Sequence, residues 1–213
     1  MKVKLALTFN ILIVICELLS FAFATDGFHG MSLTGLQYFT IDSNLFSMFT
    51  SLIFVIAIFR EIRLKSLSKI PTWVHVLRYT ATVCMALTFV VVFVILLPMD
   101  LQSGHGFGII LRMDQFFHHM LCPIFMMVSF IFFEGGSIFK PSIIAISMTP
   151  MMIYATVTMV LNIERVMVGP YPFLYVYQQP PMISVLWCVL IFVLTLILSI
   201  VLGLLQSKRM KKK

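Results

Sequence analysis

Charged side chains are scarce in this chain, and their scarcity sets its structural class. Asp, Glu, Lys and Arg make up 11% of the 213 residues, whereas hydrophobic residues make up 61%. Soluble domains carry roughly 25% charged and roughly 45–50% apolar residues. A soluble fold of this length could not bury so much apolar surface, which excludes a water-soluble globular protein. The composition therefore predicts an all-α polytopic membrane protein built as one membrane domain.

Metal-binding and disulfide motifs are also missing. The four cysteines lie within apolar segments and form neither a CxxC pair nor an extracellular disulfide frame. The chain contains no HxxxH or HExxH motif, and zinc sites need three or four ligands. We therefore expect no metal and no cofactor. A metal site that combines the adjacent histidines with Asp42 or Glu17 is an alternative that this ligand count disfavours.

The excess of basic residues, a net charge of +7, is distributed as orientation signals and not as a nucleic-acid-binding patch. Twelve of the 15 Lys and Arg residues flank the apolar runs on one side: Lys2, Lys4, Arg60, Arg63, Lys65, Lys69, Lys140, Lys208, Arg209, Lys211, Lys212 and Lys213. Only Arg112 and Arg165 flank the other side. The positive-inside rule then places both termini in the cytoplasm of a cell-membrane protein. We expect no nucleic-acid partner.

Six apolar runs reach the roughly 20 residues that a membrane-spanning helix needs. We predict spans at Leu5–Phe23, Tyr38–Phe59, Trp73–Leu97, Gln115–Phe133, Pro141–Leu161 and Met182–Leu205. The segments between them are short and leave no room for a soluble domain. The start of the chain also resembles a signal peptide with a small-residue cleavage site. Its long apolar stretch, which contains Asn10 and Glu17, favours a retained first helix.

Polar residues concentrate in one layer, which this orientation places in the outer half of the membrane. Five spans contribute to the layer, with Glu17, Thr40, Asp42, Ser43, Asn44, Asp114, His118, His119, Asn162, Glu164, Gln178 and Gln179. Ionisable groups in hydrocarbon are costly and indicate functional sites. The inner halves carry little besides His75 and Arg78, and we expect Arg78 to extend to the cytoplasmic headgroups.

The start of the second predicted span carries a candidate nucleophile. Thr40, Ser43 and Asn44 are spaced i, i+3, i+4 and share one helix face, whereas Asp42 points elsewhere. A threonine hydroxyl is weak unless a neighbouring base removes its proton, so a histidine would have to lie within hydrogen-bond reach. The alternative is that Thr40 caps the helix N-terminus, with assistance from Ser43.

The adjacent histidines of the fourth span are the candidate bases. Neighbouring residues lie about 100° apart on a helix, so we expect only one of His118 and His119 to face the site. Asp114 precedes His118 by four residues, and its carboxylate could orient that imidazole. Pro123 cannot donate a hydrogen bond to the carbonyl of His119, so we expect the backbone to be bent at the histidines.

The segment Asn162–Pro181 precedes the last span and is rich in aromatic residues and proline. Its rings suit the headgroup level of a membrane, where amphipathic aromatics accumulate. We interpret the segment as an interfacial loop anchored by tyrosines. It could instead cover the mouth of a cavity and admit a lipid.

Three stretches resemble a known group of proteins. They are Tyr38–Asn44 (YFTIDSN), Phe117-His118-His119 followed by Pro123, and Tyr171–Phe173 (YPF). The group consists of small bacterial six-helix membrane proteins of the Pr-six-Pr type, which are distantly similar to the eukaryotic androgen-induced-gene family. The eukaryotic proteins resemble threonine hydrolases that cleave fatty acid esters of hydroxy fatty acids. The resemblance implies Thr40 as nucleophile, and as base either His118 or His119, depending on the spacing to the proline.

We therefore hypothesise an intramembrane lipid-ester hydrolase with an outer-leaflet cavity. Thr40 would attack the ester carbonyl, a histidine would act as base, and Ser43 or Asn44 could stabilise the oxyanion. The partner would be a lipid or fatty acyl ester. The alternative is a membrane transporter or lipid-binding protein without enzymatic activity that uses the same polar layer.

Overall fold

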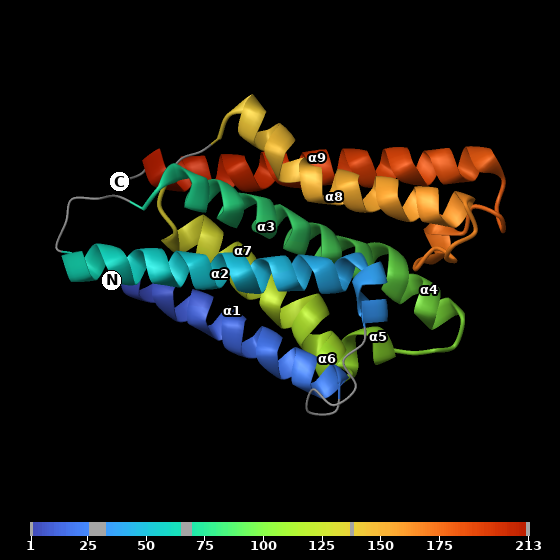
Figure 1. Ribbon diagram of the computed structural model, residues 1–213, viewed down its shortest axis with the longest axis horizontal. Coiled ribbons are helices and arrows are strands. Elements are labelled where there is room, and N and C mark those ends of the chain that lie inside the picture. Colours follow the sequence, from blue (N-terminus) through green and yellow to red (C-terminus); the bar gives the residue numbers. More distant parts are fainter. Residues whose placement is uncertain (1, 26–32, 65–69, 137–138, 212–213) are drawn as a thin grey trace.

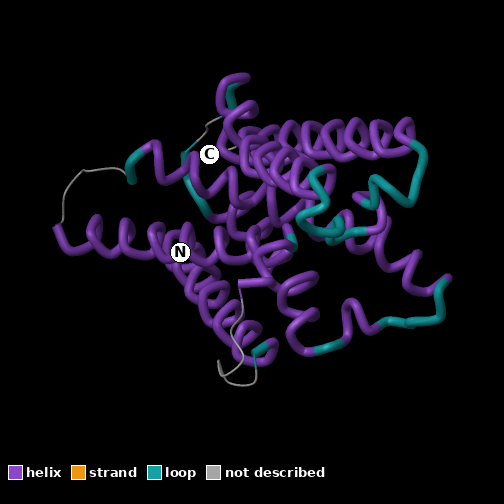
Figure 2. Tube along the Cα trace, turned by 45° about the vertical axis from the view of Figure 1, so that its right-hand side comes forward, coloured by secondary structure: helices purple, strands orange, loops and turns teal. Residues whose placement is uncertain are grey.

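The computed structural model describes residues 2–25, 33–64, 70–136 and 139–211. Within these ranges the chain is helical and contains no strand (Figure 2). The described residues include six helices that are long and apolar enough to cross a membrane: Lys2–Ala24, Phe39–Arg63, Thr72–Gln102, Met113–Phe133, Pro141–Ile163 and Pro181–Met210. The predicted multi-pass, all-α class is confirmed. The predicted orientation stays a prediction, and Lys65, Lys69, Lys212 and Lys213, on which it partly rests, lie outside the described residues.

Four of the spans are single helices and two are interrupted by π-helical turns. The single helices are α1 (Lys2–Ala24), α2 (Phe39–Leu64), α8 (Pro141–Ile163) and α9 (Pro181–Lys211). The third span joins α3 (Thr72–Val91), η2 (Val92–Leu96) and α4 (Leu97–Gln102). The fourth joins α6 (Met113–Phe116), η3 (Phe117–Leu121), α7 (Cys122–Val128) and η4 (Ser129–Phe133). In the described parts of the connecting segments lie three short helices: η1 (Leu33–Gln37), α5 (Gly108–Leu111) and η5 (Pro172–Leu174).

The long helices run side by side along the longest axis of the molecule, with α3 at the centre (Figure 1). α3 packs against α2, α7, α8 and α9, and small residues such as Ala81, Cys84 and Ala86 are buried along it. Small side chains let neighbouring membrane helices approach closely. Both labelled termini lie at one end, which we call the terminal end. The opposite end, with α4, α5 and the segment 164–180, is the site end.

The backbone departs from α-helical geometry at the histidines, as expected. η3 is a π-helical turn that contains both His118 and His119, and the N–H of Cys122 donates to the carbonyl of Phe117, five residues back. Pro123 follows directly at the start of α7 and has no N–H to donate. Single π-helical turns in longer helices occur frequently at functional sites. Pro150, in contrast, lies inside an uninterrupted α8.

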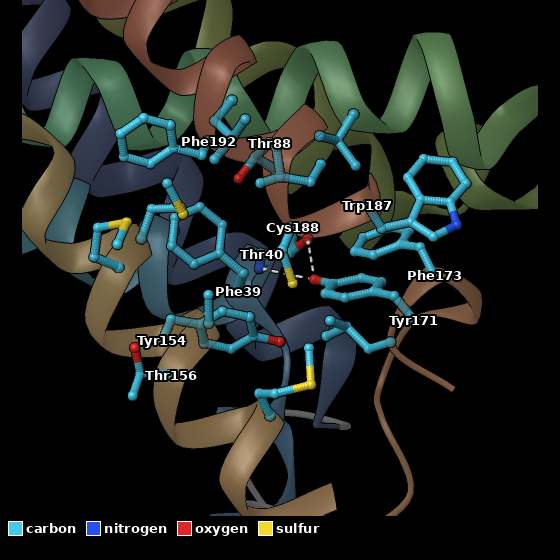
Figure 3. Close-up of a pocket in the computed structure, with 18 of the residues that line it drawn as sticks. Phe39, Thr40, Thr88, Tyr154, Thr156, Tyr171, Phe173, Trp187, Cys188 and Phe192 are labelled. Atoms are coloured by element: carbon cyan, nitrogen blue, oxygen red, sulfur yellow. Dashed lines mark hydrogen bonds between the residues drawn. The ribbon is translucent and has the colours of Figure 1, made fainter. Parts of the chain in front are cut away.

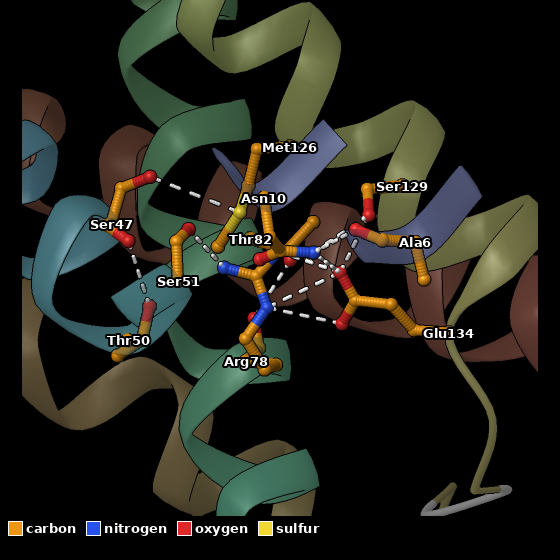
Figure 4. A network of polar contacts seen from close by, with 10 residues as sticks. All are labelled: Ala6, Asn10, Ser47, Thr50, Ser51, Arg78, Thr82, Met126, Ser129 and Glu134. Atoms are coloured by element: carbon orange, nitrogen blue, oxygen red, sulfur yellow. Dashed lines mark hydrogen bonds and ion pairs between the residues drawn. The ribbon is translucent and has the colours of Figure 1, made fainter. Parts of the chain in front are cut away.

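The half of the bundle toward the terminal end contains a buried ion pair that the sequence analysis did not anticipate. Arg78 is fully buried, and its Nε and Nη2 atoms donate to the carboxylate of Glu134 at 2.7–3.2 Å (Figure 4). Its Nη1 atom donates to Ser51 Oγ at 2.7 Å. The prediction that Arg78 extends to the headgroups is therefore wrong. Glu134 lies one residue beyond the predicted end of the fourth span, from where its side chain meets Arg78.

Two further side chains complete the shell of Glu134. Asn10 donates to Glu134 Oε1 at 3.1 Å, and Ser129 donates to the same oxygen at 2.8 Å. Burial raises the pKa of Glu134, but the charge of Arg78 and these hydrogen bonds outweigh it, so its pKa lies below the ordinary value. The cluster joins α1, α2, α3 and the end of the fourth span. The prediction that the inner halves are nearly bare is therefore also wrong.

Candidate functional site

Thr40 stands in the first turn of α2, and the residues that follow it on the same face support its backbone. Ser43 Oγ donates to the carbonyl of Thr40 at 3.0 Å, and Asn44 Nδ2 donates to the same carbonyl at 2.7 Å. Asn44 Nδ2 also donates to the carbonyl of His118 at 3.2 Å, which ties α2 to η3. Ser43 further contacts Thr88 Oγ1 at 2.9 Å. Because these donors are used on backbone carbonyls, the geometry does not leave Ser43 or Asn44 as oxyanion donors.

The hydroxyl of Thr40 meets Tyr171, a residue from the segment before α9. Tyr171 OH lies 3.4 Å from Thr40 Oγ1 and accepts a hydrogen bond from the Thr40 N–H at 3.3 Å. Among the described residues, Thr40 Oγ1 makes no bond to a backbone N–H, so it does not cap α2 there. Burial raises the pKa of Tyr171, which keeps its phenol protonated and able to donate at neutral pH.

Thr40 and Tyr171 lie on the boundary between two cavities. One cavity, of about 510 Å³, lies among α2, α3, α8 and α9 and is lined mainly by apolar side chains, among them Phe173, Trp187 and Phe192 (Figure 3). The other, of about 300 Å³, is more polar. Its lining comprises Tyr38, Thr40, Ile41, Leu96, Met99, Asp100, Ile109, Gln115, His118, His119, Pro170, Tyr171 and Pro172. We call them the apolar cavity and the histidine cavity. Both volumes fall near the roughly 300–1,000 Å³ typical of small-molecule sites.

The two histidines both line the histidine cavity, but their rings have different partners. His119 Nδ1 lies 2.6 Å from the carbonyl oxygen of Ile109. A carbonyl can only accept, so Nδ1 carries the proton and the neutral ring keeps its lone pair on Nε2. His118 Nε2 lies 3.4 Å from Glu17 Oε2, and its ring packs edge-on against Phe21 at 5.0 Å between centroids. His118 thus faces α1.

The remaining candidate residues lie around these cavities and have other partners. The Asp114 carboxylate accepts from Arg112 at 2.9 Å and from Gln115 at 2.7 Å, so its hydrogen-bonding partners do not include His118. Asn162 Nδ2 donates to the carbonyl of Leu174 at 2.6 Å and thereby fastens η5 to the end of α8. Asp42 lines neither the apolar nor the histidine cavity.

For two residues of the site, the sequence predicts a different or less important role than the structure shows. The sequence predicts that Tyr171 is an interfacial anchor. The alternative, that its segment covers the mouth of a cavity, and the resemblance that Tyr171–Phe173 carries are the signals that connect it to the site. Glu17 belongs to the predicted polar layer, but no spacing rule connects it to His118, which lies 101 positions away on another helix. In the part of the chain that the structure describes, no group of three or more His, Cys, Asp or Glu side chains could hold a metal ion.

Comparison of the chain with protein-family models, with curated proteins and with solved structures gives no match.

Proposed function

We propose that this protein is an intramembrane hydrolase of fatty acyl esters, with Thr40 as nucleophile. The observation that carries the proposal is the position of Thr40 on the wall shared by the apolar and histidine cavities. An acyl ester is divided in the same way as these two cavities, because its hydrocarbon chain is apolar, its alcohol part is more polar, and the carbonyl lies between them. With the chain in the apolar cavity and the alcohol part in the histidine cavity, the carbonyl lies at Thr40. The family resemblance noted in the sequence points to the same chemistry.

His119 is the better placed base of the two histidines. Its Nδ1 proton is held by the Ile109 carbonyl, so Nε2 is the atom that can accept a proton. In His118, by contrast, Nε2 faces α1 and lies next to the carboxyl group of Glu17. Thr40 Oγ1 hydrogen-bonds to Tyr171 and to neither imidazole, so proton transfer to His119 requires a rearrangement within the histidine cavity, which both residues line.

The reaction follows the two-step scheme of covalent acyl transfer. Thr40 Oγ1 attacks the ester carbonyl as its proton passes to His119 Nε2, and a tetrahedral oxyanion forms. The carbon–oxygen bond to the alcohol then breaks, the alcohol takes the proton from His119, and the acyl group remains on Thr40. Water, deprotonated by His119 Nε2, then attacks the carbonyl of this acyl-threonine. The carbon–oxygen bond to Thr40 Oγ1 breaks, Thr40 takes the proton back from His119, and a fatty acid is released. The net reaction consumes one ester and one water.

Two donors at the cavity boundary suit the oxyanion. They are the Tyr171 hydroxyl and the N–H of Thr40 itself, which are now bonded to each other. The N–H of a nucleophile at the start of a helix serves this role in acyl-transfer enzymes, because its dipole is fixed before the reaction. When the carbonyl oxygen of the substrate enters between these two donors, it breaks the hydrogen bond that joins them. Each donor then hydrogen-bonds to the substrate oxygen, on which the negative charge develops.

The test is covalent labelling of the full-length protein in lipid nanodiscs by a fluorophosphonate with a long alkyl chain. We expect labelling of the wild type and loss of it in Thr40→Ala and His119→Ala. Thr156→Ala is the matched control, because Thr156 lines the same apolar cavity away from the boundary. Labelling that persists in Thr40→Ala, or that is lost equally in Thr156→Ala, would contradict the assignment.

A second candidate function is proton-linked transport or lipid binding without hydrolysis. The observation that favours it is the buried pair Glu17–His118. Among the described residues, the thiol of Cys122 is the one other group placed to hydrogen-bond to the facing atoms of this pair. Intramembrane carboxyl and imidazole groups form proton relays in transporters. This alternative predicts no labelling at Thr40. It also predicts lipid movement in proteoliposomes that responds to a pH gradient and stops in Glu17→Gln.

A further inference from the structure

A third cavity, of about 630 Å³, lies between α2 and α8 on the outside of the bundle. Its lining runs from Leu36 and Leu161 at the site end to Cys84 and Pro150 near the middle of the helices. Ile153 and Val157 on its α8 wall are 64% and 50% exposed. Exposed apolar side chains on a membrane span contact lipid, so this groove opens to the bilayer. We call it the α2–α8 groove.

Among the described residues that line the groove, Asp42 is the one with a charged side chain. It is half-buried in the first turn of α2, and among the described residues it makes no hydrogen bond or ion pair. The partial positive charge of a helix N-terminus favours a carboxylate there, but Asp42 still lacks a direct donor. A carboxylate at the edge of the hydrocarbon without a partner is costly, and a bound cation would offset that cost.

Along the groove, the charged side chain lies at one end and the apolar walls follow it, which matches the order of headgroup and acyl chain in a lipid. Asp42 lies one turn from the start of α2, at the depth where lipid headgroups meet the acyl chains. From there the groove continues along α8 toward the middle of the bundle, past Val157, Ile153 and Pro150. A ligand that fits has a cationic group at one end and a hydrocarbon chain at the other.

We propose that the α2–α8 groove binds a phospholipid whose headgroup carries a primary amine, with the ammonium group on Asp42 and one acyl chain along α8. The site is separate from the proposed catalytic cavities. The rings of Phe39 and Tyr154, 5.1 Å apart between centroids, line both the groove and the apolar cavity and divide them. Tyr154 is held in place by a hydrogen bond of 2.8 Å to the carbonyl of Gln37. The lipid site does not depend on hydrolysis.

Native mass spectrometry of the full-length protein, released from detergent micelles, tests this assignment. Phosphatidylethanolamine and phosphatidylglycerol with identical acyl chains are added separately, and the fraction of protein that retains one lipid is measured against concentration. The wild type is expected to bind phosphatidylethanolamine roughly two- to fivefold more tightly, the range for one partly exposed ion pair. Asp42→Asn removes the preference while phosphatidylglycerol binding continues, which shows that the variant is folded.

Two further variants complete the experiment. Asp100→Asn is the matched control, because Asp100 lies at the same end of the bundle but lines the histidine cavity. We expect the lipid preference of this variant to equal that of the wild type. Ile153→Trp fills the groove and weakens the binding of both lipids. Equal binding of the two lipids by the wild type, a preference that survives Asp42→Asn, or a dimer that carries no lipid overturns the proposal. The dimer would show that a second copy of the chain covers the groove.

Discussion

His118 Nε2 and Glu17 Oε2 lie 3.4 Å apart, and each residue is at most 1% exposed. Apart from the thiol of Cys122, which contacts the Glu17 carboxyl group, no other described residue hydrogen-bonds to the Glu17 oxygens or to His118 Nε2. Buried polar groups are nearly always paired, so two unpaired groups that face each other are best explained by one shared proton. The contact joins α1 to the π-helical turn that also carries His119. The pair therefore affects the position of the proposed base, although it lies outside the proposed reaction.

A double-mutant cycle measures this contact. Glu17→Leu and His118→Phe each leave one buried polar group without its partner, whereas the double variant removes both. We expect the double variant to be more stable than the sum of the two single changes predicts, with a coupling of about 1–3 kcal/mol. The measurement is unfolding in detergent, with Leu18→Ala as control, because Leu18 is 47% exposed on the same helix. Effects that simply add would show that the two groups do not interact.

The pair Arg78–Glu134 is expected to dominate the stability of the half of the bundle toward the terminal end. Arg78→Met leaves the Glu134 carboxylate buried without its counter-charge, which costs about 3–5 kcal/mol in comparable sites. Arg78→Met combined with Glu134→Leu should restore much of that loss. Arg112→Met provides the contrast, because Arg112 is mostly exposed beside Asp114 and its ion pair contributes at most about 1 kcal/mol. Equal destabilisation by Arg78→Met and Arg112→Met would contradict the expectation that the buried ion pair contributes more to stability than the exposed one.

Stability should also fall at acidic pH through Glu134. Its pKa in the folded protein lies below the ordinary value of 4.5, so the unfolded chain binds the proton first as the pH falls. The stabilisation is complete above about pH 4.5 and is lost as the pH falls through the folded pKa. The melting temperature of the wild type should therefore fall more steeply below pH 4.5 than that of Glu134→Gln. Parallel curves for the two proteins would rule out this contribution.

The membrane class and the six spans could be predicted because hydropathy is a local property. Each span is predicted from its own run of apolar residues alone, and the basic residues beside the spans predict their orientation. The shared face of Thr40, Ser43 and Asn44 also followed from helix geometry, as did the disturbed backbone before Pro123. These features depend on residues that are a few positions apart.

The contacts between distant helices could not be predicted in this way. Asn10, Ser51 and Ser129 are ordinary small polar residues in their own spans, and their meeting around the Arg78–Glu134 pair depends on how four helices pack. Tyr171 reaches Thr40 across 131 positions. Asn44 satisfies the carbonyls of Thr40 and His118 because α2 lies against η3. Pairings of this kind are set by packing and not by sequence spacing.

The hydroxyl of Tyr171 should contribute to hydrolysis more than to folding. Tyr171→Phe removes the proposed oxyanion donor and keeps the ring, which stacks on Phe173 with centroids 5.1 Å apart. Loss of one such donor typically lowers kcat by about 10²–10³. We expect a decrease of that size in kcat for a long-chain acyl ester, with a melting temperature close to that of the wild type. Tyr175→Phe, in the same segment, should retain activity, and a similar kcat for both variants would remove Tyr171 from the mechanism.

Gly169 should be essential for the placement of Tyr171, because the backbone there approaches its neighbours closely. A Cβ at Gly169 would lie 2.5 Å from the Leu174 carbonyl oxygen and 2.7 Å from Asn162 Nδ2, the two groups that hold η5 to α8. Gly169→Ala must therefore displace the segment that carries Tyr171 and weaken labelling of Thr40 by the fluorophosphonate. At Gly108 a Cβ would meet nothing within 4 Å, and Ala has a higher helix propensity than Gly, so Gly108→Ala should label and unfold like the wild type. Normal labelling of Gly169→Ala would show that Tyr171 does not need this position for the reaction.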